Sequence, residues 1–146
     1  MAPERDPYKR GMLTSNPYIE RVPVSSRVVA VLEFRSHERG LILIPHPARA
    51  ILRGSIHELV STDVQDAAPN KTAESMGAVA FVEFSTGGII REGDAVLLSR
   101  KKIGEIVGFD ETHLPNHYNI VFRSNELLTG VSLGLRLMEK VTFRPP

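Results

Sequence analysis

Residues 108–120 hold most of the side chains in this sequence that can move a proton or bind a metal ion. Pro115 and the turn-forming residues around it predict a loop, and loops on a rigid scaffold commonly carry binding and catalytic groups. The segment contains two histidines, two carboxylates and two carboxamides, namely His113, His117, Asp110, Glu111, Asn116 and Asn119. Turn formation alone does not require so many polar groups. Their density makes this loop the candidate site.

General acid–base catalysis is the first chemistry that these residues suggest. A histidine titrates near neutral pH, and Asp110 or Glu111 beside it can orient the imidazole and raise its basicity. Asn116 or Asn119 can hold a carbonyl oxygen or a developing oxyanion. Such a set suits proton abstraction, isomerisation, elimination or ring closure on a small organic metabolite, without an organic cofactor. The expected catalytic residues are His113, His117, Asp110 and Glu111.

Binding of a divalent metal through His113 and His117 is an alternative. Their spacing places two histidines on one face of a helix, but Pro115 between them disfavours a helix, so the first interpretation includes no metal. The sequence lacks cysteine, which leaves histidine and carboxylate ligands. A third ligand would come from Asp110, Glu111, His46 or His57. In a third interpretation the polar residues of the loop only cap turns and bind backbone groups.

Three residues outside the loop are further candidates. Two prolines flank His46 at the end of a predicted strand, where it faces either a barrel mouth or the solvent. His57 and Glu58 are neighbours in another predicted strand, so one of them must face inward, where burial would perturb its titration. The expected substrate-binding residues are Asn116, Asn119, His46, His57 and Glu58.

The composition of the chain limits the classes of partner that we expect. The chain has 146 residues and a formal charge of +1, from 18 basic and 17 acidic side chains that are interspersed. This balance gives no electrostatic footprint for nucleic acid or an anionic membrane. The apolar runs are far shorter than the ~20 residues of a membrane span, and the start lacks a secretion signal. Together with the absence of cysteine, this predicts a cytoplasmic protein that binds a small molecule.

The elements that must position the loop are β-strands. Apolar, β-branched runs such as 27–34, 77–84 and 103–109 are broken by glycine, proline and asparagine at intervals typical of all-β folds. We predict about eight or nine short strands in one closed or nearly closed small β-barrel over residues 25–146. Glycines within 103–109 suit tightly coiled strands. Prolines interrupt residues 1–24, which predicts an extended tail, either flexible or docked.

Three finer expectations concern pairing. Residues 27–34 and 41–44 are expected to form a hairpin, and residues 48–52 have the composition of a single helical turn. Small barrels often associate through edge strands, so a homodimer is also expected.

A partial family resemblance covers about residues 88–123. In order along the chain stand Arg91-Glu92-Gly93-Asp94, then Ile106-Val107-Gly108, then the histidine-bearing segment that leads into Ile120-Val121-Phe122. This order resembles the bacterial glucitol/sorbitol phosphotransferase enzyme IIA domain, although Asn116 replaces the glycine before His117 and the loop is shorter. The resemblance implies a small barrel and a phosphocarrier-like role. The rest of the chain looks like a small bacterial β domain, so a non-catalytic ligand-binding or interaction domain is the alternative to an enzyme.

Overall fold

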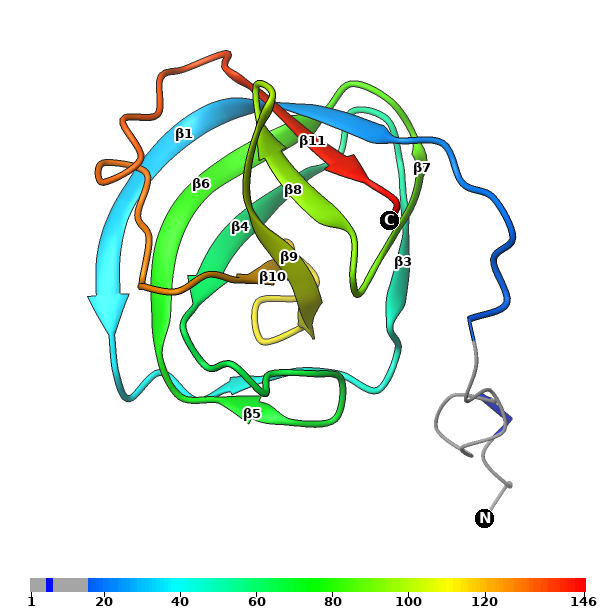
Figure 1. The fold of residues 1–146 in the computed structure, drawn as a ribbon, viewed down its shortest axis with the longest axis horizontal. Coiled ribbons are helices and arrows are strands. Elements are labelled where there is room, and N and C mark those ends of the chain that lie inside the picture. The colour runs from blue at the N-terminus through cyan, green and yellow to red at the C-terminus, as the bar shows by residue number, and fades with distance from the viewer. Residues whose placement is uncertain (1–4, 7–15) are drawn as a thin grey trace.

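The protein is a closed β-barrel with two small sheets beside it (Figure 1). The computed structural model describes residues 5–6 and 16–146, which form eleven strands. Among these residues there is no helix, and so none long and apolar enough to span a bilayer. The predicted all-β barrel is therefore confirmed.

Seven strands form the barrel, in the spatial order β1, β11, β8, β9, β10, β4 and β6. These strands are β1 (Val24–Ser36), β4 (Ile56–Thr62), β6 (Met76–Phe84), β8 (Ala95–Leu98), β9 (Lys101–Asp110), β10 (Asn119–Arg123) and β11 (Lys140–Arg144). The two small sheets pair β2 (Leu41–Ile42) with β5 (Thr72–Ala73) and β3 (Ala48–Ile51) with β7 (Gly88–Arg91).

One pairing in the barrel is parallel. Six neighbouring pairs are antiparallel, but β4 and β10 run in the same direction, with Glu58 opposite Asn119 and Leu59 opposite Ile120. The starts of β4 and β10 therefore lie at the same end of the barrel, together with the end of β9. The loop that follows Asp110 is at this end.

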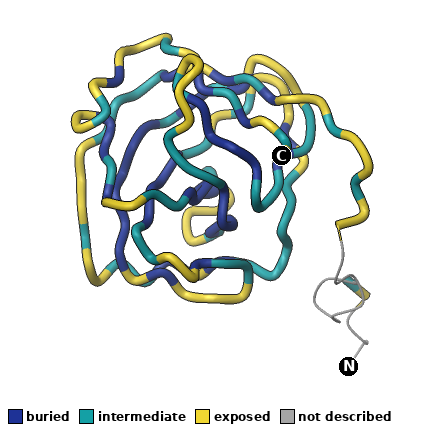
Figure 2. Tube along the Cα trace, viewed as in Figure 1, coloured by how far each residue is buried: buried dark blue, intermediate teal, exposed yellow. Residues whose placement is uncertain are grey.

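The barrel wall separates two hydrophobic clusters. The larger cluster draws residues from all seven barrel strands, including the fully buried Leu59, Ile120 and Phe122, and fills the interior. Neighbours of these residues in the chain, such as Val60 and Val121, point the other way because side chains alternate along a strand. They pack outside the barrel with residues of β2 and β5. Figure 2 shows this pattern, with buried residues along the barrel strands and exposed ones at the turns.

Close contact between β9 and β10 depends on Gly104. A Cβ at this position would lie 2.3 Å from the carbonyl oxygen of Arg123, so any larger residue would force the strands apart. The pairing of β8 with β9 also shifts register, between Val96 and Leu97. These features fit the tight coiling that the glycines of this strand predict.

Two local expectations are wrong. Residues 48–51 form strand β3 rather than a helical turn, because they pair with β7 and bury Ile51. Residues 41–42 do not form a hairpin with β1. They pair with β5, while β1 pairs with β6 and β11, which lie much later in the sequence.

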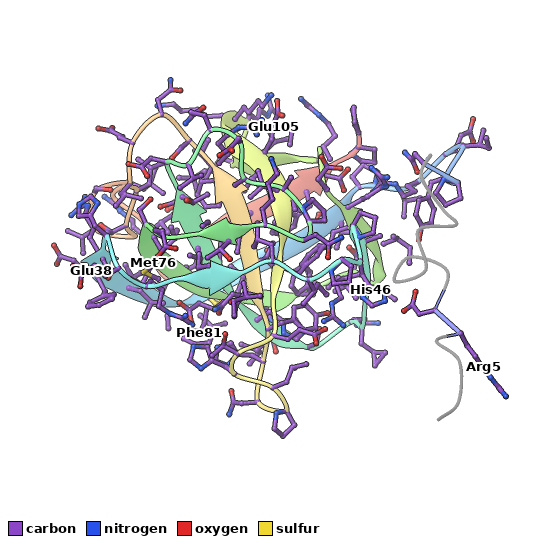
Figure 3. All side chains as sticks on the ribbon, turned by 90° about the horizontal axis from the view of Figure 1, so that it is seen from below. Arg5, Glu38, His46, Met76, Phe81 and Glu105 are labelled. Atoms are coloured by element: carbon purple, nitrogen blue, oxygen red, sulfur yellow. The ribbon has the colours of Figure 1, made fainter. Side chains whose placement is uncertain are left out.

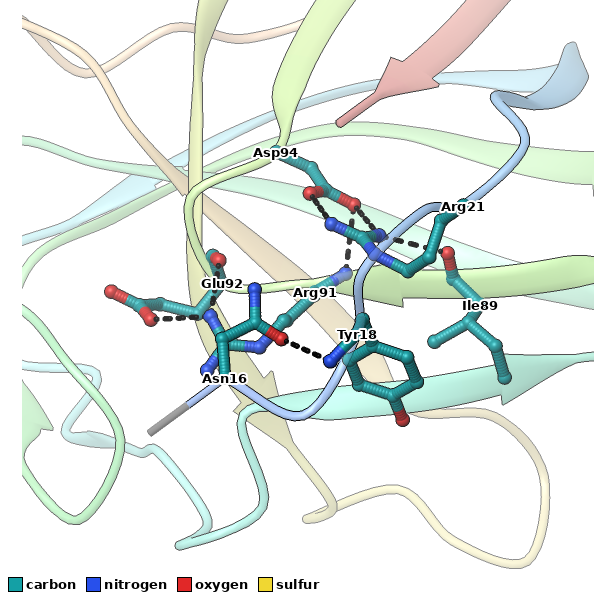
Figure 4. Close-up of polar contacts among 7 residues, drawn as sticks. All are labelled: Asn16, Tyr18, Arg21, Ile89, Arg91, Glu92 and Asp94. Carbon is teal, nitrogen blue, oxygen red and sulfur yellow. Dashed lines mark hydrogen bonds and ion pairs between the residues drawn. The ribbon is translucent and has the colours of Figure 1, made fainter. Parts of the chain in front are cut away.

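The chain before β1 is held by a buried ion pair (Figure 4). The guanidinium of Arg21 donates to both carboxylate oxygens of Asp94, at 2.6 and 2.7 Å, and to the carbonyl oxygen of Ile89 at 3.1 Å. Asp94 also accepts the backbone N–H of Arg91 at 2.9 Å. The segment is thus fixed to the turn between β7 and β8. The other residues of the predicted tail, 1–4 and 7–15, lie outside the described part of the chain.

We expect Asp94→Asn to lower the free energy of unfolding by about 3–5 kcal/mol, because removal of one partner leaves a buried charge uncompensated. Only 7% of the Arg21 side chain and 1% of that of Asp94 are exposed. Urea denaturation followed by circular dichroism measures the change. The control is Glu83→Gln, which breaks the exposed pair with Arg27 and should cost less than about 1 kcal/mol. Equal effects of the two substitutions would contradict this account.

Candidate functional site

The loop after β9 folds into successive tight turns that bring its two histidines together. Leu114 N–H donates to the Glu111 carbonyl at 3.1 Å, and Asn116 N–H donates to the His113 carbonyl at 3.0 Å. As a result the rings of His113 and His117 stack, with centroids 5.1 Å apart and planes inclined by 28°. A non-helical turn therefore places them as near to each other as a helix would.

The two carboxylates of the loop are engaged elsewhere. Asp110 is fully buried and accepts the backbone N–H groups of Ile42 and Thr112, both at 2.9 Å. It therefore fixes the start of the loop to β2. Glu111 forms an ion pair with Arg49 of β3.

The carboxylate beside the histidines is Glu58 of β4. Its Oε1 lies 3.4 Å from Nε2 of His117, and each of the two side chains is 12% exposed. Glu58, His113 and His117 each offer one ligand atom, and these atoms all lie within 4.8 Å of one another. The rings of Phe81 and His117 pack edge to face, with centroids 4.8 Å apart and planes inclined by 80°. Figure 3 shows Phe81 beside the loop, on the outside of the barrel wall.

The hydrogen bonding of His117 leaves one ring nitrogen without a proton. Nδ1 lies 2.6 Å from Oδ1 of Asn116, so the N–H of the neutral ring donates there and Nε2 carries a lone pair. Nε2 is buried and has no hydrogen-bond partner among the described residues, although Glu58 is close. Two groups that only accept hydrogen bonds thus face each other, an arrangement that calls for a proton or a cation between them.

Burial disfavours the charged forms of both His117 and Glu58. Desolvation lowers the pKa of His117 and raises the pKa of Glu58. The positive charges of His113 and Arg39 act against the rise at Glu58, and the charge of Asp110 adds to it. The pair is therefore stabilised by a proton or a cation that lies between its members.

His57 lies on the other side of the barrel wall from Glu58. Its ring stacks on Tyr118 at 3.8 Å between centroids, and the guanidinium carbon of Arg49 lies 4.4 Å from the centre of the same tyrosine ring. Tyr118 thus contacts both a cation and an imidazole, and it belongs to the interior cluster that contains Phe109 and Phe84. Burial lowers the pKa of His57 to about 4, and the charges of His117 and Arg49 contribute.

The remaining sequence candidates have separate contacts. His46 pairs with Asp6 near the start of β3. Asn119 is 2% exposed and donates to Asp110 at 3.4 Å, while its own Oδ1 is buried without a partner among the described residues. The sequence interpretation did not include Arg49 or Tyr118. Tyr118 is the aromatic residue inside the polar loop, which was the available signal, but nothing in the sequence marks Arg49.

Two adjoining hollows lie at the opposite ends of β9 and β10 from the histidine loop. Their volumes are about 370 and 350 Å³, and they share Lys102, Ile103, Ser124 and Asn125. No histidine lines either hollow. Three of their charged groups pair with one another, because Glu105 bonds Lys102 at 2.6 Å and approaches Arg123 at 3.5 Å.

We expect the metal-free protein to lose stability between neutral pH and about pH 4 because of His57. Its folded pKa of about 4 lies below its ordinary value of 6.5, so its contribution is complete above pH 6.5 and is lost as the unfolded chain takes up a proton. After a reduction for solvent screening of this half-buried group, the loss should be on the order of 2 kcal/mol. Urea denaturation in chelator at several pH values measures it. His57→Phe keeps the stacked ring and should reduce the pH dependence, to which the lowered pKa of His117 also contributes. Identical slopes in both proteins would contradict the assignment.

Comparison with known proteins places the chain in a family. The family model described as "Family of unknown function (DUF6917)" matches residues 18–144. No curated protein and no solved structure matches the chain significantly. The matched region includes all eleven strands together with Glu58, His113 and His117. The chain therefore belongs to the DUF6917 family.

Proposed function

We propose that this protein is a small-molecule enzyme that binds a divalent transition metal through Glu58, His113 and His117 and uses it for acid–base chemistry. The observation that carries the proposal is the buried Nε2 of His117, which faces the carboxylate of Glu58 without a hydrogen bond. A metal ion between these two atoms satisfies both.

The spacing of the donor atoms supports this assignment. A tetrahedral metal with bonds of about 2.1 Å needs its ligand atoms about 3.4 Å apart. Nε2 of His117 and Oε1 of Glu58 already have that separation, at 3.4 Å. His113 is exposed on the loop, and its ligand atom lies within 4.8 Å of the other two. Little rearrangement of the barrel is required.

The chemical type of the three ligands also supports the proposed metal site. Two imidazoles and one carboxylate are a set that zinc and ferrous iron use in catalytic sites, where a further position stays open for water or substrate. The exposure of His113 leaves that open side toward solvent. Asn116 supplies the outer hydrogen bond that fixes the tautomer of a metal-binding histidine.

The chemistry would be that of a lyase, isomerase or cyclase. When bound, a divalent metal supplies an acidified water or polarises a carbonyl. Glu58 and His117, each 12% exposed, would hold the ion, and the Phe81 ring packs beside His117. In this proposal the carboxylate role expected of Asp110 and Glu111 passes to Glu58, which reaches the histidines from β4.

A non-catalytic, phosphocarrier-like role is the second candidate. It is favoured by the exposure of His113, whose ring is open to a partner protein. In that case a histidine should accept phosphate from a donor protein, and mass spectrometry should find the adduct on the intact chain.

We expect the chelator-treated protein to bind one Co²⁺ or Zn²⁺ per chain, measured by titration calorimetry. Glu58→Gln and His117→Ala should abolish binding because each removes a ligand. Asn116→Ala should weaken it roughly 10–100-fold through loss of the outer hydrogen bond.

His46→Ala is the matched histidine control and should bind as the wild type does. Circular dichroism of each variant checks that it is folded. Failure of the wild-type protein to bind either ion, or unchanged binding by folded His117→Ala, would overturn the proposal.

A further inference from the structure

One row of side chains crosses three neighbouring barrel strands next to the histidine loop. Asn119 of β10 is opposite Glu58 of β4 on one side and opposite Asp110 of β9 on the other (Figure 1). Side chains that are directly opposite in a sheet lie on the same face. The carboxamide of Asn119 therefore lies on the face that carries Glu58, between two carboxylates. His117 contacts Glu58 on this face as well.

The neighbouring carboxylate of Asp110 fixes the orientation of this carboxamide. A carboxylate only accepts hydrogen bonds, so the end of Asn119 that faces Asp110 must be the amide. Nδ2 of Asn119 lies 3.4 Å from Oδ1 of Asp110. The oxygen and nitrogen of a carboxamide point in different directions, so Oδ1 of Asn119 is directed away from Asp110. Glu58 lies on that side of the residue.

Oδ1 of Asn119 is an acceptor without a donor. Asn119 is 2% exposed, and this oxygen is buried and has no hydrogen-bond partner within residues 5–6 and 16–146. Nε2 of His117, two residues earlier in the chain, is in the same condition. A proton shared between Glu58 and His117 would still leave the oxygen of Asn119 without a partner. A metal ion, in contrast, can bind an atom of each of the three residues.

We propose that Oδ1 of Asn119 is a fourth protein ligand of the metal ion. The inference rests on the metal site proposed above. Two imidazoles, one carboxylate and one carboxamide oxygen form a mixed set of nitrogen and oxygen donors, which suits Mn²⁺, Fe²⁺ and Co²⁺ as well as zinc with five ligands. Water or substrate then takes a fifth or sixth position.

This assignment also gives the buried Asp110 a task. Its carboxylate accepts the amide of Asn119 and the backbone N–H groups of Ile42 and Thr112. It therefore orients a metal ligand in the way that Asn116 orients His117, which is the usual role of a residue behind the ligands.

Two substitutions of Asn119 separate a ligand from a structural residue. Asn119→Ala removes both the oxygen and the amide, and should weaken Co²⁺ binding by the chelator-treated protein at least about tenfold. Asn119→Asp keeps an oxygen ligand but loses the amide that binds Asp110. It should bind Co²⁺ at least as tightly as the wild type, because its charge attracts the dication. Titration calorimetry measures the affinities, and circular dichroism checks that each variant is folded.

Asn125→Ala is the matched control, since it removes an exposed asparagine beyond the other end of β10 and should bind as the wild type does. Unchanged binding in folded Asn119→Ala would overturn the inference while leaving the metal site intact. Equal losses in Asn119→Ala and Asn119→Asp would also overturn it, because that pattern assigns Asn119 a structural role through Asp110.

The visible spectrum of the cobalt-loaded wild-type protein is a test that needs no variant. The weak absorption of a five- or six-coordinate ion is expected, and the intense absorption of a four-coordinate ion would overturn the inference alone. Absence of Co²⁺ binding by the wild-type protein would overturn both the inference and the metal site.

Discussion

The parallel pairing of β4 with β10 is the constraint on which the candidate site depends. It places Glu58 opposite Asn119, and so beside the end of the histidine loop. Because side chains alternate along a strand, a shift of one residue would turn Glu58 into the barrel and His57 out of it. The register is held by the interior residues Leu59 and Ile120, which have no exposed surface. Packing inside the barrel therefore decides which carboxylate meets the histidines outside it.

His57 and Glu58 are neighbours in β4 but lie on opposite faces of the barrel wall. His57 is held neutral in an aromatic stack with Tyr118, and its lowered pKa reflects burial together with nearby positive charge. Glu58 is also partly buried, but it faces nitrogen atoms that can bind a cation. On the inner side the aromatic contacts compensate for the lost solvent. On the outer side Glu58 and His117 have no such contact, and in our proposal a metal ion supplies the compensation.

The sequence predicted the fold well because its signals are local. Alternating apolar runs and turn residues mark strands, and Pro115 marks the loop, without reference to distant partners. Residues 48–51 misled the prediction because their short, alanine-containing run resembles a helical turn until β7 pairs with it. The argument from Pro115 against a helix was sound, yet a turn brought His113 and His117 together by another route.

The site itself was harder to predict because its members are joined by long-range pairing. Asp110 and Glu111 were natural partners for the histidines by proximity in sequence. At the end of β9, however, Asp110 is fully buried and accepts a backbone amide of β2, while Glu111 meets Arg49. Glu58 was recognised as a candidate but assigned to substrate binding. Its contact with His117 follows from strand order, which no local pattern reveals.

The distribution of unsatisfied polar atoms concerns the same region. Buried nitrogen and oxygen atoms without hydrogen bonds occur in four of the described residues, and each such atom costs about 1–3 kcal/mol. His117 and Asn119 flank Tyr118 in the chain, and Arg49 packs on the Tyr118 ring. His117 and Asn119 lie at the start of β10, and Arg49, which also pairs with Glu111, reaches the same region through Tyr118. Elsewhere in the fold, the buried charges of Arg21 and Asp94 are fully paired with each other. The unsatisfied atoms near Tyr118 therefore fit a region where a ligand binds.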